Sequence, residues 1–406
     1  MSRIWLISEY YYPVVVTTGY YVTEIAEYLA QKGKDVGVIC TNNTYYESDT
    51  VSSVEHEIHN GVEIYRVLDK RITKDHLVKR AMRLLFSSIS IYKLAKKLIK
   101  EGDEVIILTN PAFLMLFMPK VRRLTKCRYH ILVHDIFPEN LVSIGKFSNQ
   151  SFGFKFLKKL FDKAYTAADS CISIGCDMTE VIKAKTNNSK PITKITNWAD
   201  VDDVCLLNKK DTRLYAEYKD DLNDKVVFMF AGNLGKAQGL DNYLEAIKLT
   251  SNLNARFLFV GAGAKSEDIK SFSKTTDKII FAGFRNRSEQ NDFLNACDIG
   301  VVTLADGMFG LGVPSKSYNL MATGKPILYI GEPNSEIAYC INKYNIGWVV
   351  EPNNPQALKD MIDTIVEHPE DIPQKSLNAR NVANEVFAKP VVLEQYNQFF
   401  TKAKRL

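Results

Sequence analysis

The sequence predicts an α/β protein built from two doubly wound domains, each a parallel sheet with helices on both faces. The chain has 406 residues, and a single hydrophobic core stops growing near roughly 250–300 residues, so about two domains are expected. Short apolar runs alternate with segments of helical periodicity along the chain. One highly charged stretch, residues 200–224, interrupts the alternation near its middle.

The first half contains seven apolar runs that favour strands. They are residues 4–7, 36–40, 62–67, 105–108, 129–133, 171–174 and 192–195. Helical periodicity fills the gaps: Val22, Ile25, Ala26 and Leu29 form one apolar stripe, which ends before Gly33. Strands this apolar, separated by helices, are typical of a parallel sheet that is buried on both faces.

The second half repeats the pattern with six candidate strands. They are residues 226–230, 256–260, 279–281, 299–304, 327–330 and 348–350. We therefore expect an N-terminal domain over residues 1–205 and a C-terminal domain over residues 206–388, with the charged stretch 200–224 as a linker. Residues 389–406 are expected to form a terminal helix with its apolar positions at helical spacing.

Composition bounds the class of protein. The longest apolar run, residues 112–118, is far shorter than the roughly 18–20 residues that span a bilayer, and the chain starts directly with a strand-like run, so a cytoplasmic protein is expected. The seven cysteines are scattered without a CxxC pair, and Cys40, Cys171 and Cys297 fall within apolar segments. We expect buried, reduced thiols and no metal site.

The net charge of +5 is unevenly distributed. Residues 1–200 hold 28 Lys and Arg against 21 Asp and Glu, whereas the remainder holds 24 against 26. The excess is concentrated in two helix-like stretches, residues 76–100 and 152–163. Such basic amphipathic helices can lie on an anionic membrane or can simply present a solvated face, and both interpretations stay open. The sequence contains no known nucleic-acid-binding module.

The most informative segment is residues 314–326, PSKSYNLMATGKP, which follows a glycine-rich loop. The spacing predicts a helix that begins near Ser315 and Lys316. Free N–H groups and the positive end of the helix dipole favour an anion at such a start, and Lys316 adds a mobile positive charge. The segment therefore predicts a phosphate-binding site.

Other candidate residues follow predicted strands, where ligands of parallel sheets bind. In the first half these loops carry Gly19, the pair His134 and Asp135, and the motif NWAD, residues 197–200. In the second half they carry AGNLGKAQGLDNYLEAI, residues 231–247, and VGAG, residues 260–263. Each glycine turn is weak evidence alone, but their conjunction points to one ligand site.

With these segments the chain resembles glycosyltransferase family 4, in its branch that builds bacterial capsule, O-antigen and colanic-acid-type polysaccharides. The resemblance runs from EYYYP and VHDIFPE through ITNWAD and AGNLGKAQG to PSKSYNLMATGKP. It implies the GT-B fold, with two Rossmann-like domains facing across a cleft, and a terminal helix that crosses back to the N-terminal domain. It also implies a retaining enzyme that binds its sugar nucleotide mainly to the C-terminal domain and its acceptor mainly to the N-terminal one.

The resemblance assigns roles residue by residue, with departures. The family's phosphate-binding Arg and Lys fall on Asn233 and Gln238, and its paired glutamates fall on Leu311 and Asn319. Lys236 and Lys316 are therefore expected to hold the diphosphate, and His134 to contact the donor sugar. The candidate catalytic residues are His134 and Lys236. The candidate substrate-binding residues are Gly19, Asp135, Asn197, Gly232, Asn233, Gly235, Gln238, Gly261, Phe284, Ser315, Lys316 and Asn319.

The implied partners are a nucleoside-diphosphate sugar, with UDP favoured, and a polyprenyl-diphosphate-linked saccharide acceptor. No cofactor or metal is expected, because cations and N–H donors can stabilise the charge that builds on the departing diphosphate. The resemblance favours a hexosyl or N-acetylhexosaminyl transferase that is peripheral at the inner face of the cell membrane.

Several alternatives remain. Asp200 and Asp202 fit a metal-binding DxD pattern, although short acidic triplets arise easily in charged stretches. The side chains of Tyr10, Tyr11 and Tyr12 could stack on a sugar or be ordinary loop aromatics. A GT-B sugar-nucleotide epimerase or a non-catalytic nucleotide-sugar-binding subunit are the competing function classes. Release of nucleoside diphosphate only when acceptor is present would separate a transferase from both.

Overall fold

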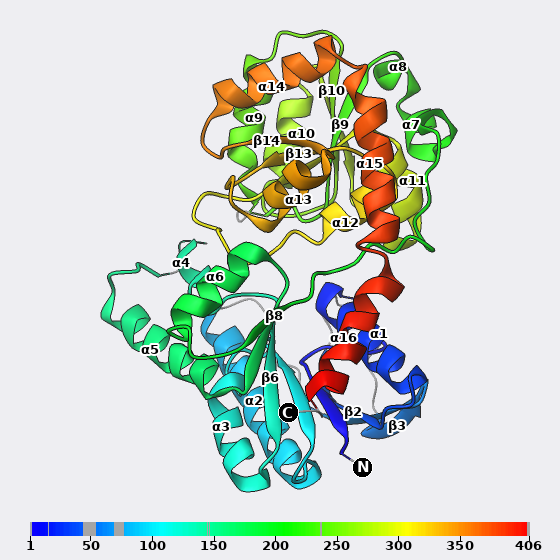
Figure 1. Ribbon diagram of the computed structural model, residues 1–406. Helices are drawn as coiled ribbons and strands as arrows, with labels where there is room; N and C mark the ends of the chain where they lie inside the picture. Colours follow the sequence, from blue (N-terminus) through cyan, green and yellow to red (C-terminus); the bar gives the residue numbers. More distant parts are fainter. Residues whose placement is uncertain are drawn as a thin grey trace. The chain divides into compact units, whose positions relative to one another are not determined.

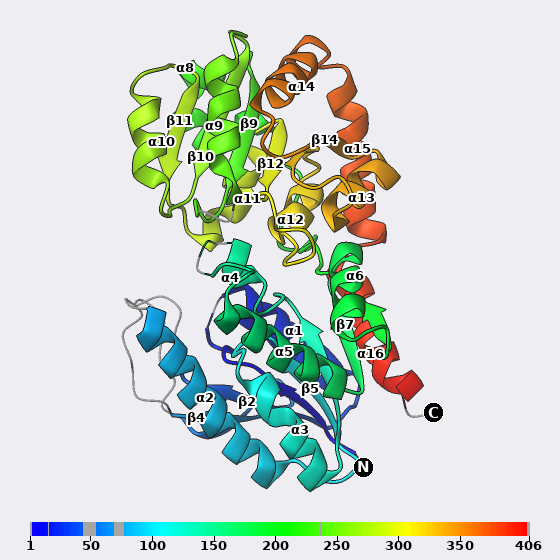
Figure 2. The ribbon, with the colours of Figure 1, turned by 90° about the vertical axis from the view of Figure 1, so that its left-hand side faces the viewer.

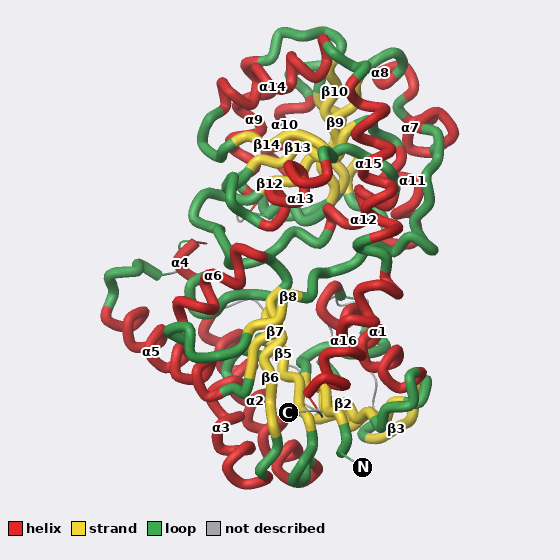
Figure 3. The backbone as a smooth tube through the Cα atoms, viewed as in Figure 1, coloured by secondary structure: helices red, strands yellow, loops and turns green. Residues whose placement is uncertain are grey.

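The chain folds into two compact α/β units in a computed structural model that describes residues 2–14, 16–43, 54–68, 77–143, 145, 147–235 and 238–403 (Figure 1). Unit 1 comprises Met1–Ile195, Gly310–Gly312 and Leu393–Leu406. Unit 2 comprises Thr196–Phe309 and Val313–Val392. Each unit is a sheet flanked by helices, as the separate colours of helices and strands show in Figure 3. The expected fold class, two doubly wound Rossmann-like domains, is confirmed.

Unit 1 is built on an eight-stranded sheet in the order β3-β4-β2-β1-β5-β6-β7-β8. All neighbouring pairs are parallel except β3 and β4. The strands are β1 (Ile4–Ile7), β2 (Val36–Thr41), β3 (His56–His59), β4 (Val62–Val67), β5 (Glu104–Leu108), β6 (Arg128–Val133), β7 (Ser170–Ser173) and β8 (Ile192–Lys194). The central strands are fully buried, so their continuous apolar runs are those of a sheet covered on both faces.

The helices of unit 1 connect successive strands, except for α16 at the end of the chain. They are α1 (Thr17–Gln31), α2 (Leu77–Leu98), α3 (Leu114–Thr125), α4 (Asn140–Ser143), α5 (Phe152–Ala167), α6 (Cys176–Lys185) and most of α16 (Lys389–Ala403). In Figure 2, α2, α3 and α5 lie together in front of the strands. The apolar stripe predicted for α1 is buried as expected, and both basic stretches of the first half are helical, as α2 and α5.

Unit 2 has a six-stranded, all-parallel sheet in the order β11-β10-β9-β12-β13-β14. The strands are β9 (Val226–Ala231), β10 (Ala255–Val260), β11 (Ile279–Gly283), β12 (Ile299–Thr303), β13 (Ile327–Ile330) and β14 (Gly347–Val350). The helices are α7 (Arg213–Glu217), α8 (Lys219–Leu222), α9 (Leu240–Leu249), α10 (Ser266–Ser273), α11 (Gln290–Asn295), α12 (Lys316–Ala322), α13 (Glu336–Tyr344), α14 (Pro355–Glu367) and α15 (Asp371–Glu385).

Alternate residues of the central strand β9 pack into two different cores. Phe228 and Phe230 join a cluster with α9 and α14 on one face of the sheet. Val227 and Met229 join a second cluster with α12 and α15 on the other face. Because successive side chains of a strand point to opposite faces, this division places helices on both sides of the sheet.

Two features differ from the sequence-based expectation. Strand β3 was missed, because its residues HEIH are mostly polar; it is an edge strand that pairs antiparallel with β4 and leaves Ile58 72% exposed. The expected linker is folded instead. Within residues 200–224 lie η1 (Lys209–Asp211), α7 and α8, because Leu214, Tyr215 and Leu222 are buried in a core of unit 2 while the charged side chains between them face outward.

The cysteines expected to be buried thiols are free and buried at positions 40, 171 and 297. Burial raises the pKa of each of these three thiols to about 12, so they stay protonated. Across the described part of the chain, no helix combines the length and apolarity needed to cross a membrane.

Candidate active site

Two glycine-containing loops meet at the carboxyl ends of β9 and β10. Gly232 N donates to Val260 O (2.9 Å), Leu234 N donates to Ala262 O (3.0 Å), and the two loops are thereby hydrogen-bonded to each other. Gly261 has φ +141°, and a Cβ at this position would lie 1.9 Å from Gly232 O. Only glycine fits here, so the backbones of the two loops form one continuous surface at the sheet edge.

The side chain of Asn233, which occupies the family's Arg position, lies between these loops. Its Oδ1 is 2.7 Å from where a Cβ of Gly263 would be, and its Nδ2 is 3.1 Å from where a Cβ of Gly235 would be. Asn233 thus packs on both glycines while remaining solvent-exposed. Lys236, the expected catalytic cation of this loop, lies outside the described residues.

Lys316 is placed beside these loops by the start of α12. Its Nζ lies 3.5 Å from the centre of the Phe230 ring and donates to Gln238 Oε1 at 3.2 Å. Its Cδ is 3.9 Å from where a Cβ of Gly232 would be. Among the described residues no carboxylate forms an ion pair with Lys316, and burial lowers the pKa of its ammonium group well below the usual value. The site therefore holds a cation that lacks a counter-ion.

The start of α12 departs from the expected anion-binding geometry. The helix has only seven residues and begins at Lys316. The N–H of Ser317 donates to Pro314 O and the N–H of Tyr318 donates to Ser315 O, both at 3.2 Å. These two N–H groups are not available to an anion, because the chain enters the helix through a tight turn with hydrogen bonds between residues i and i+3. The Ser315 side chain makes no capping bond, so the Lys316 side chain, rather than the helix end, is the principal feature of this segment.

The structure joins two sequence motifs, NWAD and PSKSYN. The Oδ1 of Asn319 accepts a hydrogen bond from Asp200 N at 3.2 Å. Asn197 is 6% exposed, and Ala199 N donates to Phe387 O at 2.7 Å. The NWAD segment is therefore anchored between α12 and the end of α15, and Asn319 holds it in place.

Asp200 is engaged within unit 2 rather than presented to a metal. Its Oδ2 lies 3.6 Å from Arg287 Nη2, and its side chain is 7% exposed. Within the described ranges, no three His, Cys, Asp or Glu side chains are grouped so that they could hold a metal ion. The DxD interpretation of Asp200 and Asp202 therefore has no support from the geometry.

In unit 1, His134 and Asp135 occupy the turn directly after β6. Both backbone N–H groups approach Thr109 Oγ1, at 3.4 and 3.3 Å. The His134 ring makes an edge contact with Tyr21 on α1, with 6.1 Å between ring centres. Burial lowers the pKa of His134 from 6.5 to about 4. The imidazole is therefore neutral at physiological pH and can donate one hydrogen bond and accept another.

Residues 310–312 of the glycine-rich loop belong to unit 1. Ile136 N donates to Leu311 O at 3.1 Å, and Gly310 N donates to Asp177 Oδ2 at 3.2 Å. Leu311, the position of the family's first glutamate, therefore lies beside the turn that carries His134, with its own side chain 7% exposed. A leucine at this position contributes an apolar side chain to the packing and offers no carboxylate to a ligand.

The N-terminal loop is mostly structural. Gly19 lies within α1, where a Cβ would meet Val14 O at 2.8 Å. The close approach that this glycine permits in the structure is to its own loop. Tyr10 and Tyr11 are buried, which favours the loop-aromatic interpretation for both; only Tyr12 is exposed, and its ring is stacked on His59 at 3.8 Å.

The remaining predicted residues divide between the site and the surface. Gln238 lies at the site through its bond to Lys316. Phe284 follows β11 and is 64% exposed. Sequence reasoning missed Phe230, which forms the face on which Lys316 rests; the signal was an aromatic residue directly preceding the glycine loop. It also missed the buried pair of Arg83 and Glu9 in unit 1, which no local pattern reveals.

Comparisons with known proteins point to glycosyltransferases. The family described as "Glycosyl transferases group 1" matches residues 216–382. "Probable glycosyltransferase WbjE" of Pseudomonas aeruginosa is 34% identical over 401 residues, which covers 98% of this chain and 97% of that protein. "Putative colanic acid biosynthesis glycosyl transferase WcaI" of Escherichia coli (strain K12) is 22% identical over 398 residues, covering 95% and 96%. HepE of Anabaena, solved in complex with UDP, superimposes with a TM-score of 0.70 at 12% identity over 99% of this chain and 100% of that one.

Proposed function

The chain belongs to the group 1 glycosyl transferases and is a glycosyltransferase of bacterial polysaccharide synthesis, and from this premise we propose the finer reaction. It moves a hexosyl or N-acetylhexosaminyl group from a UDP-sugar to a polyprenyl-diphosphate-linked saccharide, with retention of configuration. The C-terminal domain, residues 206–388, binds the donor. The N-terminal domain, residues 1–205, binds the acceptor at the inner face of the cell membrane.

The observation that carries this proposal is the position of Lys316 beside the glycine loops, where no carboxylate of the described residues pairs with it. A partly buried ammonium group without a counter-ion is costly, and a diphosphate would supply the missing negative charge. Gly232 brings backbone close to the same point, because a Cβ there would meet the Lys316 side chain at 3.9 Å, and glycine permits a ligand's close approach. The UDP complex of HepE, a protein of the same fold, supports a uridine nucleotide as the occupant.

The chemistry follows from where charge develops. As the bond between the sugar C1 and the β-phosphate oxygen breaks, negative charge builds on UDP, and Lys316 with Lys236 stabilises it without a metal. The acceptor hydroxyl forms the new bond to C1 from the same face, and its proton passes to the departing diphosphate. The diphosphate thus acts as both leaving group and base.

His134 supplies a neutral imidazole to the sugar. Because its pKa lies near 4, it does not compete with Lys316 for the diphosphate and can hydrogen-bond a sugar hydroxyl. Asp135 and Asn197 complete the contacts proposed for unit 1 and the NWAD segment. Asn233, Gln238, Phe284, Ser315 and Asn319 complete those proposed for the donor, with Asn319 acting through the NWAD segment that it anchors.

The test is a transfer assay with purified protein, a set of UDP- and GDP-sugars, and a polyprenyl-diphosphate-linked saccharide in detergent. We expect UDP release only when both substrates are present, and a product whose anomeric configuration, read by NMR, matches that of the donor. Preference for GDP-sugars would contradict the nucleotide assignment, and an inverted product would contradict retention. Interconversion of sugar nucleotides without acceptor would instead indicate an epimerase.

A further inference from the structure

Three helices that cover one face of unit 1 are strongly basic. Together α2, α3 and α5 contain 13 Lys and Arg against one Asp and no Glu. The helices α9, α10 and α14, which cover one face of unit 2, contain three basic residues against seven acidic ones. We call α2, α3 and α5 the basic layer; α3 contacts both of the others, and Figure 2 shows all three on one side of the sheet.

Within the basic layer, α5 presents aromatic residues and lysines along a single outward stripe. Phe152, Phe156, Lys159 and Lys163 are spaced i, i+4, i+7 and i+11 and are all exposed, so they share one helix face. Phe152 is 85% exposed and Phe156 is 57% exposed. The phenylalanines occupy the first half of the helix and the two lysines its second half. Two adjacent phenylalanines left in water imply a partner that covers them.

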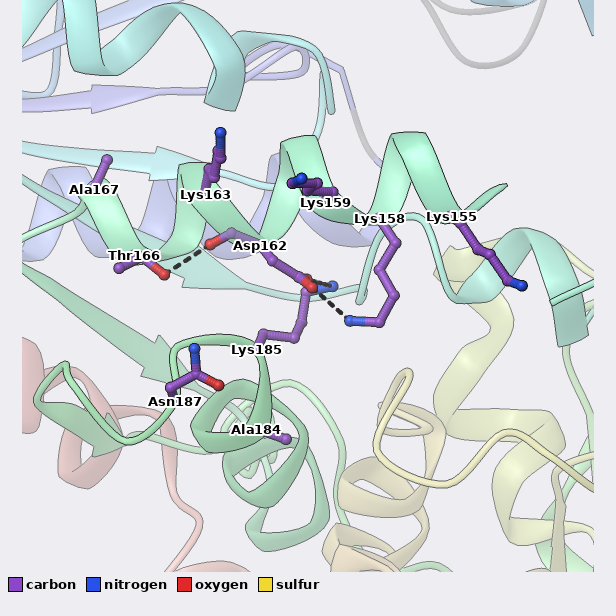
Figure 4. Close-up of a pocket in the computed structure, with 10 residues that line it drawn as sticks. All are labelled: Lys155, Lys158, Lys159, Asp162, Lys163, Thr166, Ala167, Ala184, Lys185 and Asn187. Atoms are coloured by element: carbon purple, nitrogen blue, oxygen red, sulfur yellow. Dashed lines mark hydrogen bonds and ion pairs between the residues drawn. The ribbon is translucent and has the colours of Figure 1, made fainter. Parts of the chain in front are cut away.

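The carboxylates beside α5 already pair with other lysines. A cavity of about 660 Å³ lies along α5 and α6, and its lining includes Lys158, Lys159 and Lys163 of α5 and Lys185 of α6. In this cavity Lys185 Nζ bonds to Glu139 and Asp162, each at 2.7 Å, and Lys158 Nζ bonds to Asp162 at 2.6 Å. In Figure 4, Lys158 and Asp162 point toward Lys185, whereas Lys159 and Lys163 point away from it. The nearby carboxylates are thus neutralised inside the cavity, and no described residue forms an ion pair with Lys159 or Lys163.

Helix α2 repeats the same arrangement. Its exposed apolar residues Met82, Leu85 and Phe86 are 48%, 37% and 51% exposed. The exposed lysines 93, 96 and 97 follow on the second half of the helix. Both helices therefore carry exposed apolar side chains near their N-terminal ends and lysines farther along. Because crossover helices start at the carboxyl edge of a parallel sheet, the apolar ends lie near the edge where the loop of His134 lies.

We propose that the basic layer docks on an anionic lipid bilayer, with Phe152, Phe156, Met82, Leu85 and Phe86 entering the interface and the lysines contacting lipid phosphates. Charge complementarity identifies the occupant: both helices carry exposed lysines that pair with no described carboxylate, next to exposed apolar side chains, which is the pattern of helices that lie in a membrane surface. The inference rests on the proposed function, because a lipid-linked acceptor would then be delivered to the edge of unit 1 that faces the bilayer.

The experiment is co-sedimentation of the full chain with vesicles of phosphatidylglycerol mixed with phosphatidylcholine, and with vesicles of pure phosphatidylcholine. We expect binding to the anionic vesicles only, and weaker binding as salt is added. The double variant Lys159→Gln/Lys163→Gln should lower the partition constant roughly thirtyfold, at the usual contribution of a lysine near an anionic surface. The double variant Phe152→Ser/Phe156→Ser should lower it about tenfold or more.

The matched control is Lys270→Gln/Lys274→Gln in unit 2, which removes the same charge from exposed positions of or next to α10. If this control lost as much vesicle binding as the α5 lysine variant, the effect would depend on net charge alone and the proposal would be overturned. Unchanged vesicle binding by the α5 variants, or equal binding of the wild type to neutral vesicles, would also overturn it. The α5 variants should keep full turnover on acceptor in detergent. Vesicle binding by a chain that transfers no sugar in detergent would contradict the proposed function and leave the docking surface standing.

Discussion

Cations that are removed from water have different partners at two places in the molecule, one in each unit. In unit 1, Arg83 forms an ion pair with Glu9, and the side chains of the two are 7% and 1% exposed; Lys185 is likewise held between Glu139 and Asp162. In unit 2, Lys316 meets the Phe230 ring and the Gln238 amide, and among the described residues no carboxylate pairs with it. A paired buried cation is part of the structure, whereas an unpaired one is available to a ligand.

Removal of Arg83 gives the largest expected effect on stability. Arg83→Ala leaves the Glu9 carboxylate buried without its counter-charge, which should lower the free energy of unfolding by about 3–5 kcal/mol. Urea denaturation of the variant and the wild type measures this. Lys316→Ala serves as the comparison and should change stability little or raise it, because it removes an uncompensated cation. Similar losses in both variants would break the distinction between the units.

Replacement of His134 should affect turnover and leave donor affinity intact. His134→Ala should reduce the rate roughly 100-fold, because a hydrogen bond to the reacting sugar is lost, while calorimetric titration with UDP stays unchanged. The wild-type rate should also fall as the pH approaches about 4, where the imidazole becomes charged. Joint loss of rate and UDP affinity would show that the histidine is structural.

Replacement of Lys316 is expected to have the opposite effect, a loss of donor affinity. Lys316→Ala should weaken UDP binding about 10- to 100-fold, since charge-assisted hydrogen bonds contribute roughly 1.5–3 kcal/mol. Lys274→Ala, at an exposed lysine of the same unit, is the control and should bind UDP normally. If Lys316→Ala bound UDP with wild-type affinity, the diphosphate would have to bind elsewhere. Lys316 would then no longer differ from Arg83 in being available to a ligand.

The smallest expected effect is a pH dependence of UDP affinity. Burial lowers the pKa of Lys316 in the free protein, and a bound diphosphate would raise it again, so binding takes up a proton. Affinity should therefore decrease as pH rises from the lowered value toward the usual lysine pKa of about 10.4. Titrations in buffers of different ionisation enthalpy measure the uptake. A slope that persists in Lys316→Ala would assign the proton to another group.

Local pattern predicted most of the fold and the parts of the site that are local. The strands were visible because both faces of each sheet are covered, and the glycine loops because backbone approach requires glycine. The pairing of Arg83 with Glu9 spans 74 positions, and the bond between Asn319 and Asp200 spans 119. Contacts between residues so far apart in the sequence do not affect the periodicity of apolar residues along the chain. For this reason the sequence could predict Lys316 as a cation of the site but could not say whether it already had a partner.

The contact between Gly232 and Gly261 has a consequence for variation of the enzyme. A side chain at 261 would collide with the opposing carbonyl at 1.9 Å and would sit at φ +141°, so a saturation library should return only glycine there. A second substitution at position 232 could not restore such a variant, because the positive φ at position 261 would still exclude residues other than glycine. Directed evolution of donor choice would therefore work through side chains beside these two glycines, such as Asn233 and Gln238, and not through the glycines themselves.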